Sequence, residues 1–233
     1  MSRRRLERIL ALLSTGSQTE PTAARLCDVC AEATAMTGAG IMLMSGDVPA
    51  GSVCTTDAVS ALIEDMQFML GEGPCVDAFT EGRPVLEPDL AAPVSPRWPA
   101  FSPPVLEVSV RAVFGFPLQL GAVRLGALNL YRDQPGPLSD DQHADALVMA
   151  GVASRAVLTM QAGASPNAVA EELDIDGEFH LAVHQASGMA AVQLGVTVGE
   201  ALIRLRAYAF LHDRTLSHVA EEVVARRLRL DAS

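Results

Sequence analysis

The chain has 233 residues, 49% of them hydrophobic, so it is long enough for one medium domain and one small domain with real cores. It is acidic, because 28 Asp and Glu residues outnumber 17 Arg residues, no Lys occurs, and the net charge is -11. This balance argues against a general affinity for polyanions, since phosphate binding depends on Lys and Arg. The composition also excludes a disordered chain.

The first 161 residues predict an alternation of helices and strands. Residues 3–13 predict an amphipathic helix, and residues 21–38 predict a second helix that begins at Pro21 and ends at Gly38. The remaining elements are expected as strands at 39–45 and 51–56, a helix at 57–70, extended segments at 83–90, 111–121 and 122–133, and a helix at 139–161. Ser139 and Gln142 form a capping box at the start of the last helix. The pattern predicts an α+β fold with helices packed on an antiparallel sheet.

The last 72 residues predict a linker and a small helical bundle. Residues 162–176 are small, polar and acidic, which is typical of a linker. Three short helices follow: one over 178–194, one over 198–212 that a capping box of Thr197 and Glu200 opens, and one from about Thr215. The middle helix is apolar almost all round, which predicts that it lies buried at the centre of the bundle.

The basic residues are concentrated in this C-terminal part. Residues 178–233 hold 6 Arg against 6 acidic residues and four of the five His, whereas residues 1–177 hold 11 Arg against 22 acidic residues. Any surface that binds nucleic acid is therefore predicted in the last quarter of the chain.

The start of the chain does not read as a signal peptide. An Arg cluster precedes apolar residues, but Glu7 and Arg8 interrupt them. No apolar run approaches the roughly 18 to 20 residues that a membrane span needs. We therefore expect a cytoplasmic protein with no membrane partner.

The cysteines and histidines form no pattern that predicts a metal site. Cys27 and Cys30 make a C-x-x-C within a predicted helix, but no second ligand pair exists, so we expect packing, without zinc and without a disulfide to lose. His180 and His184 share a helix face without a third ligand, which favours surface or interface positions. Cys75, near a helix start, is a weaker candidate for a redox-sensing thiol with a lowered pKa. No metal and no cofactor are expected.

Signatures of catalysis are missing as well. The sequence has no G-x-S-x-G, no P-loop and no H-E-x-x-H. The segment GEGPCV begins like a dinucleotide fingerprint but has Val76 in place of the third glycine, so we interpret it as a turn before a helix. These observations predict a binding or regulatory protein and not an enzyme.

Two segments resemble known families. Residues 183–228, with QASG, EALIRLRAYA and LSHVAEEVV in order, resemble an ANTAR domain, the RNA-binding three-helix module of bacterial transcription antitermination regulators. Upstream, LGEGPCVDAFTEGRPVLEPDL and VFGFPLQLGAVRLGALNLYRDQPGPLSDDQ resemble a GAF domain of the kind fused to ANTAR. The resemblance implies a domain order of an N-terminal helix (1–20), a GAF-like domain (21–161), a linker (162–176) and an ANTAR-like domain (177–233).

The resemblance also implies a function and a set of RNA-binding residues. Such regulators bind paired hexanucleotide stem-loops in nascent RNA and prevent terminator formation, a use that suits recognition of unpaired bases by few polar side chains. The matching positions are Gln185, Ser187, Gly188 and Arg206. Charge and position add His184, His212 and Arg214. The family often has Lys where this chain has Ser187, and Arg204 is expected to pair with Glu200 one turn away.

Alternatives remain open for both parts of the chain. The C-terminal bundle could have lost RNA binding and serve a dimeric adaptor, or the protein could regulate through DNA, although its last helix lacks a following recognition helix. The GAF-like part could sense a small molecule, but the sequence does not identify the ligand. The motif N-K-x-F-x-D-E of cyclic-nucleotide binding is absent, and His143, near the start of the last helix, is badly placed to bind haem. It could instead be a dimerisation platform. A homodimer is expected, since two-site RNA suits a two-fold protein.

Overall fold

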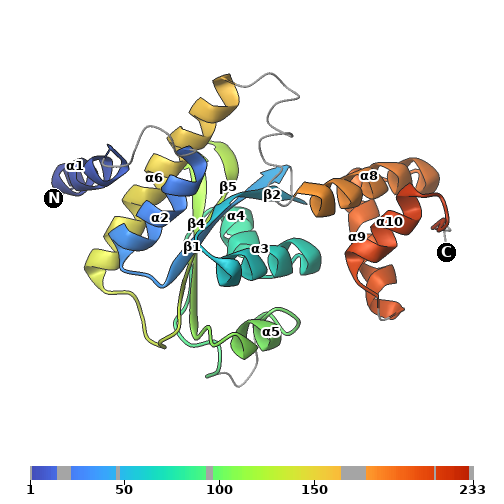
Figure 1. Cartoon of the computed structure of the whole chain (residues 1–233), viewed down its shortest axis with the longest axis horizontal. Helices are drawn as coiled ribbons and strands as arrows, with labels where there is room; N and C mark the ends of the chain where they lie inside the picture. Colours follow the sequence, from blue (N-terminus) through green and yellow to red (C-terminus); the bar gives the residue numbers. More distant parts are fainter. Residues whose placement is uncertain are drawn as a thin grey trace. The chain divides into compact units, whose positions relative to one another are not determined.

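The computed structural model describes residues 2–14, 22–45, 48–92, 97–163, 177–212 and 214–230. It divides into two compact units (Figure 1). The N-terminal unit contains residues 1–45 and 49–165, and the C-terminal unit contains residues 166–233 together with 46–48. Most of the predicted linker, 162–176, lies outside the described residues and stays a prediction.

The N-terminal unit is built on a five-stranded sheet with the order β2-β1-β5-β4-β3. The strands are β1 (Gly38–Ser45), β2 (Val48–Thr55), β3 (Val85–Glu87), β4 (Ala112–Leu120) and β5 (Val123–Arg132). The central strand β5 pairs antiparallel with β1 on one side and with β4 on the other. Gly121, whose φ of 59° is in the left-handed region, turns the chain from β4 into β5. The strands and this tight turn lie where the sequence predicted them, although β2 begins three residues earlier than expected and β3 covers only part of the segment 83–90.

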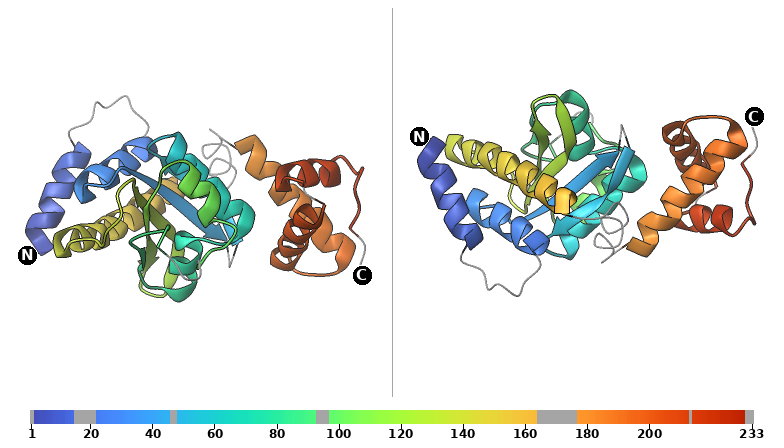
Figure 2. Two further views of the ribbon diagram at one scale, coloured as in Figure 1. Left: turned by 90° about the horizontal axis from the view of Figure 1, so that it is seen from below. Right: turned by 90° about the horizontal axis from the view of Figure 1, so that it is seen from above.

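Helices cover both faces of this sheet (Figures 1 and 2). One face carries α2 (Thr22–Thr34) and α6 (Asp140–Gly163), and the other carries α3 (Ala58–Leu70) and α4 (Pro74–Glu81). Alternation along β4 explains why both faces are apolar, because Phe114, Phe116 and Leu118 point to one side and the residues between them to the other. The Phe116 ring meets the His143 ring of α6, with centroids 5.6 Å apart.

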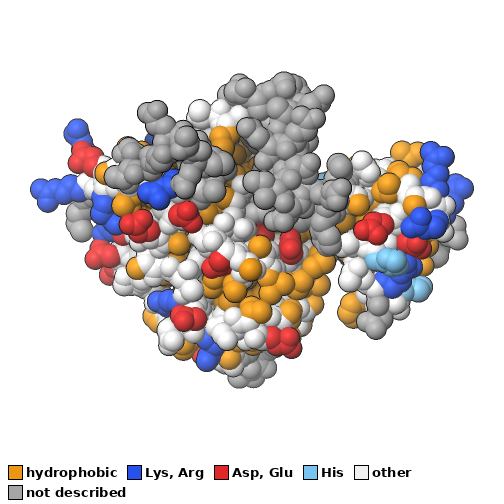
Figure 3. All heavy atoms as spheres, viewed as in Figure 1, with side chains coloured by type: hydrophobic (Ala, Val, Ile, Leu, Met, Phe, Trp, Pro, Cys, Tyr) orange, Lys and Arg blue, Asp and Glu red, His pale blue; other side chains and the backbone are white. Residues whose placement is uncertain are grey.

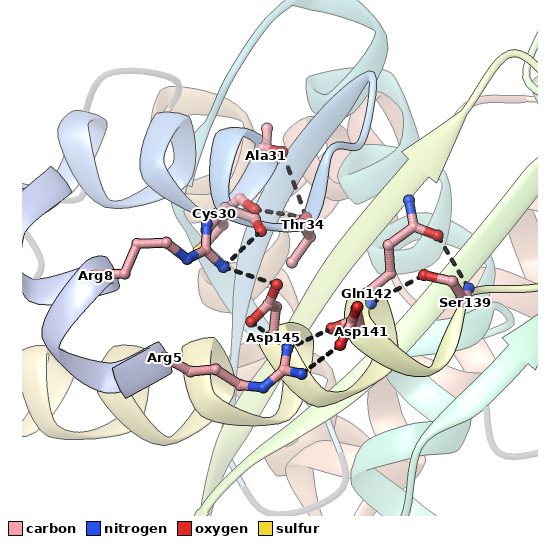
Figure 4. Close-up of polar contacts among 10 residues, drawn as sticks. Arg5, Arg8, Cys30, Ala31, Thr34, Ser139, Asp141, Gln142 and Asp145 are labelled. Atoms are coloured by element: carbon pink, nitrogen blue, oxygen red, sulfur yellow. Dashed lines mark hydrogen bonds and ion pairs between the residues drawn. The ribbon is translucent and has the colours of Figure 1, made fainter. Parts of the chain in front are cut away.

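The α1 helix (Ser2–Ser14) is held on α6 by ion pairs (Figure 4). Arg5 Nη1 lies 2.8 Å from Asp145 Oδ1, and Arg8 Nη2 lies 2.7 Å from Asp145 Oδ2. Arg5 also pairs with Asp141. Because Ile9 is completely buried, α1 adds apolar contact to these ion pairs.

The second helix ends earlier than the sequence predicted. It stops at Thr34, and Ala35 adopts a left-handed φ of 52° that turns the chain out of the helix. Gly38 is instead the first residue of β1. A Cβ at Gly38 would lie 2.4 Å from the Tyr131 ring, so this glycine permits close packing on β5 and does not end the helix. A short helix, α5 (Ser102–Glu107), also lies in the Pro-rich connection and was not predicted.

The expectation that the protein has no disulfide is wrong. Cys27 in α2 is bonded to Cys54 in β2, whereas Cys30 and Cys75 are free and buried. The C-x-x-C spacing placed Cys27 beside Cys30 in the sequence, and Cys30 packs in the core as predicted. The sheet brings Cys54 close to Cys27, because α2 packs on β1 and β2 is the neighbour of β1.

The C-terminal unit contains three helices, α8 (Gly177–Leu194), α9 (Val198–Leu211) and α10 (Leu216–Val224), which pack on one another. Gly195, with a φ of 66°, ends α8. The predicted capping box opens α9, because Thr197 Oγ1 accepts from Glu200 N and Glu200 Oε2 accepts from Thr197 N. The core of the unit consists of small and aliphatic side chains: Val183, Ala186, Ala190, Ala201, Leu202, Leu205, Ala209, Leu216, Val219, Ala220 and Val223.

The prediction that the middle helix lies buried at the centre of the bundle is wrong. Only one side of α9 is covered by α8 and α10, and Ile203, Phe210 and Leu211 are 62%, 83% and 78% exposed. An apolar composition all round a helix therefore does not mean burial here, since two short neighbouring helices cover only one side.

No single helix among the described residues is long and apolar enough to cross a membrane. Only one pair of the described helices reaches the required length and hydropathy when the two are taken together, Ala182–Leu194 and Val198–Leu211. The chain bends by 103° between them.

Candidate functional sites: a buried polar cluster and an exposed helical surface

Four polar or nucleophilic side chains meet inside the N-terminal unit, and we call them the buried polar cluster: Glu64 and Gln67 of α3, Cys75 of α4 and Asn129 of β5. Asn129 lies opposite Gly40 of β1 and opposite Gly115 of β4. Directly opposite residues of an antiparallel sheet point to the same face, so the Asn129 side chain projects between two glycines.

The two glycines show what lies above Asn129. A Cβ added to Gly40 would lie 2.7 Å from Glu64 Oε1, and a Cβ added to Gly115 would lie 2.2 Å from the carbonyl oxygen of Pro74. Asn129 therefore faces α3 and the start of α4. Any larger residue at position 40 would displace the Glu64 carboxyl group, and one at 115 would collide with the α4 backbone.

Hydrogen bonding within the cluster is incomplete. Gln67 Oε1 accepts from Cys75 N at 2.7 Å, which ties α3 to the first turn of α4. Both carboxyl oxygens of Glu64, Gln67 Nε2 and both amide atoms of Asn129 have no hydrogen-bond partner within the described part of the chain. A buried polar atom without a partner costs about 1–3 kcal/mol, so a small polar ligand that bonded these atoms would be stabilised strongly. The cluster supplies both donors and acceptors for such a ligand.

Burial also shifts the acidity of two groups. Burial, with a smaller contribution from the nearby Asp65, raises the pKa of Glu64 to about 8. Burial, together with the Glu64 carboxylate, raises the pKa of the Cys75 thiol, although Gln67 acts in the opposite direction. The hypothesis that the start of α4 gives Cys75 a lowered pKa is therefore wrong, because burial outweighs the helix end.

Sequence reasoning did not find this cluster. The available signals were Glu64 and Gln67, three residues apart on the apolar side of a helix, and Asn129 inside the apolar strand LGALNLY. Each is a polar residue at a position whose spacing predicts burial. Only the fold brings the two segments together, because they are far apart in the sequence.

The candidate RNA-binding residues of α8 differ in exposure. Gln185 is exposed, and His184 and Gly188 are half-buried. Ser187 is buried and donates to the carbonyl oxygen of Val183 at 2.7 Å. A side chain at position 187 thus faces the interior of the bundle, so the difference from a basic residue at this position concerns packing. A Cβ at Gly188 would meet nothing within 4 Å, so this glycine is not required for a close helix contact.

The candidates on α9 and after it also differ in exposure. Arg206 is half-buried, and burial lowers its pKa to about 10, so its guanidinium stays charged at neutral pH. His212 is exposed at the end of α9, where its ring stacks on Tyr208 with centroids 3.9 Å apart. Arg214 pairs with Glu222 Oε2 at 3.4 Å.

Figure 3 shows Arg and His side chains gathered on one face of the C-terminal unit.

The expected ion pair of Arg204 with Glu200 is not among the ion pairs of the described residues, and Glu200 instead caps α9. Among those residues, no group of three or more His, Cys, Asp and Glu side chains is arranged to hold a metal ion.

Comparison with known proteins defines the class of the N-terminal unit. Its fold is similar to the GAF domain of a phosphoenolpyruvate-protein phosphotransferase from Coxiella burnetii, with a TM-score of 0.52 and 15% identity over 70% of this chain and 95% of that chain. The corresponding GAF domain from Acinetobacter has a TM-score of 0.53 and 13% identity over 70% of this chain and 96% of that chain. At these identities the likeness shows the fold alone.

The family follows from the sequence itself. Residues 19–157 match the family described as GAF domain, and the match does not extend into the C-terminal unit. The chain therefore belongs to the GAF domain family, whose members are sensory or ligand-binding regulatory modules. No curated protein matches the chain.

Proposed function

We propose that the protein is a transcription antitermination regulator whose C-terminal unit binds paired hexaloop stem-loops in nascent RNA under the control of its GAF domain. The observation that carries this proposal is the surface of the three-helix unit where exposed polar residues lie near the half-buried Arg206. It includes Gln185, Arg206 and His212, and it belongs to the part of an acidic chain where Arg balances the acidic residues. The resemblance of residues 183–228 to an ANTAR domain supports the same assignment.

The surface suits recognition of unpaired bases better than binding along a duplex. A protein that follows duplex phosphates needs many cations, and this unit has only 6 Arg against 6 acidic residues. A loop that is read by a few polar side chains needs far fewer. Arg206 supplies a planar guanidinium that can bond a base edge or a phosphate with two donors.

The GAF domain supplies the regulatory input in this proposal. Its buried polar cluster is the place where a small polar ligand would act, and the domain is also expected to join two copies in a homodimer. The role is regulatory and not catalytic. The adaptor without RNA binding and the regulator that binds DNA are the competing functions.

A gel shift with three probes separates these functions: RNA with two hexaloop stems, the same RNA with its loops closed into paired stems, and duplex DNA. We expect a shift with the first probe alone. A shift with duplex DNA alone would support the DNA-binding regulator, and no shift with any probe would support the adaptor. Light scattering on the same samples measures whether the complex contains two copies of the chain.

Arg206→Ala tests the residue on which the proposal depends most. We expect it to weaken hexaloop binding by about 1–3 kcal/mol, the range for a good bidentate contact. Because Arg206 is half-buried, a thermal melt of the variant checks that it is folded at the temperature of the binding assay. Arg229→Ala is the control, because it removes an exposed Arg from the same unit outside α9 and should change RNA affinity by only a few tenths of a kcal/mol. Equal RNA affinities of the two variants would remove Arg206 from the binding surface.

A further inference from the structure

The C-terminal unit exposes an apolar helix face that none of the roles described above uses. Ile203, Ala207, Phe210 and Leu211 are spaced by four, three and one residues along α9, so they share one side of the helix. We call these four residues the α9 face. Its aromatic member, Phe210, is 83% exposed, with Ile203 and Leu211 at 62% and 78%. Large apolar side chains that gather on a surface in this way mark a binding site.

The charges around the α9 face indicate the chemistry of its partner. Arg206 precedes Phe210 by one helical turn and lies at one edge of the face, and Arg204 follows Ile203 at the other edge. Two carboxylates of the same unit have partners outside the α9 face. Glu200 caps the start of α9, and Glu222 is paired with Arg214 and Arg227. An aromatic and aliphatic surface between two arginines is suited to an anionic partner with flat apolar groups.

Unpaired nucleotides have this combination of properties. Each base offers a π-face that stacks on an aromatic ring, and each phosphate carries a negative charge for a neighbouring Arg. A second copy of this chain fits less well, because a two-fold contact through the same face would bring Arg204 and Arg206 of both copies together.

We propose that Phe210 is a stacking platform for an unpaired base of the RNA loop, with Ile203 and Leu211 as apolar contacts on either side of it. The inference rests on the proposed RNA-binding function and adds to it the way in which the loop is held. Phe210 supplies affinity through stacking, which is tolerant of base identity, whereas Arg206 supplies a charged contact.

Three variants at one position separate stacking from general apolar contact. Phe210→Ala removes the ring, Phe210→Leu keeps apolar volume without a π-face, and Phe210→Trp keeps a π-face. Affinity is measured by fluorescence anisotropy of the labelled two-hexaloop RNA over a series of salt concentrations. The RNA carries 2-aminopurine in a loop, whose fluorescence is quenched when the base stacks. Val123→Ala, at a 57% exposed position in the GAF domain, is the control.

We expect Phe210→Ala and Phe210→Leu to weaken binding by about 5- to 150-fold, the range for loss of one stacked base, and Phe210→Trp to bind like the wild type. The slope of affinity against salt should not change, because stacking releases no counterions. The 2-aminopurine quench should disappear in the Ala and Leu variants alone. Thermal stability should stay constant, since the ring is exposed.

Each other result overturns the inference in an identifiable way. Wild-type binding that survives Phe210→Ala or Phe210→Leu leaves the proposed function standing and removes the stacking platform. A Phe210→Ala variant that changes from dimer to monomer in light scattering shows that the α9 face joins two copies. A wild-type protein that binds no hexaloop RNA at all contradicts both the proposed function and the platform.

Discussion

The two units place polar and apolar side chains in opposite ways. In the N-terminal unit, Phe68, Phe114 and Phe116 are completely buried, and the core also contains the polar side chains of Glu64 and Asn129. In the C-terminal unit, Phe210 is 83% exposed, while the core is made of small and aliphatic residues. The first unit is therefore equipped to take a polar group inside, and the second to present an apolar group outside.

The two arrangements suit two kinds of ligand, a small molecule for the buried polar cluster and a large partner for the exposed Phe210. A buried polar cluster can respond only to a ligand small enough to enter the fold, because its side chains are buried and Gly40 and Gly115 leave no room for a Cβ. An exposed ring can contact a large partner without any change of the fold. In the proposed function, the GAF domain receives the signal and the C-terminal unit binds the RNA.

The largest effect is expected from a pair of phenylalanine substitutions that tests the contrast directly. Phe114→Ala should destabilise the N-terminal unit by about 3–5 kcal/mol, because it removes a completely buried ring and leaves a cavity. Phe210→Ala should change stability by less than about 0.5 kcal/mol. Urea denaturation followed by circular dichroism measures both values. Similar losses in the two variants would mean that Phe210 is covered in solution and that the contrast is wrong.

The next effect concerns the disulfide, which is found only in the first unit among the described residues. The 27-residue separation of Cys27 and Cys54 predicts that reduction costs about 3–4 kcal/mol of stability through loop entropy, with 2–4 kcal/mol typical of measured bonds. Thermal melts with and without dithiothreitol test this value. A Cys54→Ala variant is the control, because the reductant should have no further effect on it. Equal sensitivity of both proteins to the reductant would contradict the bond.

The third effect depends on pH and comes from Glu64. Its pKa is about 8 in the folded protein and near 4.3 in an unfolded chain, so the folded state binds the extra proton between these values. Stability from this group is thus fully present below about pH 4 and is lost as the pH rises toward 8. Glu64→Gln cannot ionise, so it should be more stable than wild type at pH 8 by about 1–3 kcal/mol and equal to it near pH 4.

Denaturation of both proteins at several pH values measures this difference. The C-terminal unit provides an internal comparison, since none of its described core residues listed above is ionisable. A wild-type stability that does not fall between pH 5 and pH 8 would show that Glu64 ionises normally and that the cluster is open to solvent.

Much of the fold could be predicted because its signals are local. Capping boxes at Ser139 and Thr197, and Gly121 between two alternating strands, fix element ends within a few residues of sequence. Two errors are local, the end of α2 and the missed α5, and the others concern contacts between distant segments. Cys27 and Cys54 are joined only when α2 and β2 are both on the sheet, and Asn129 meets Glu64 only after three strands are in register.

In the C-terminal unit, the sequence predicted the helices but not which of their side chains are exposed. The composition of α9 correctly showed an apolar helix, but exposure depends on how many neighbours cover it, and composition does not contain that information. Ser187 and Gln185 are two residues apart, yet one is buried and the other exposed, because the helix turns them to different sides. Whether the predicted RNA-binding residues contact RNA stays a prediction.

The ion pairs of α1 extend the folded GAF domain beyond the N-terminal end of the family match. The family match begins at residue 19, but Asp145 lies against Arg5 and Arg8, and its side chain is only 12% exposed. A truncated chain that begins at residue 19 would keep this carboxylate and lose both of its cations, at a cost that is large for a buried charge. It would also uncover the apolar surface on which Ile9 rests. For expression and crystallisation, the first helix belongs with the domain that follows it.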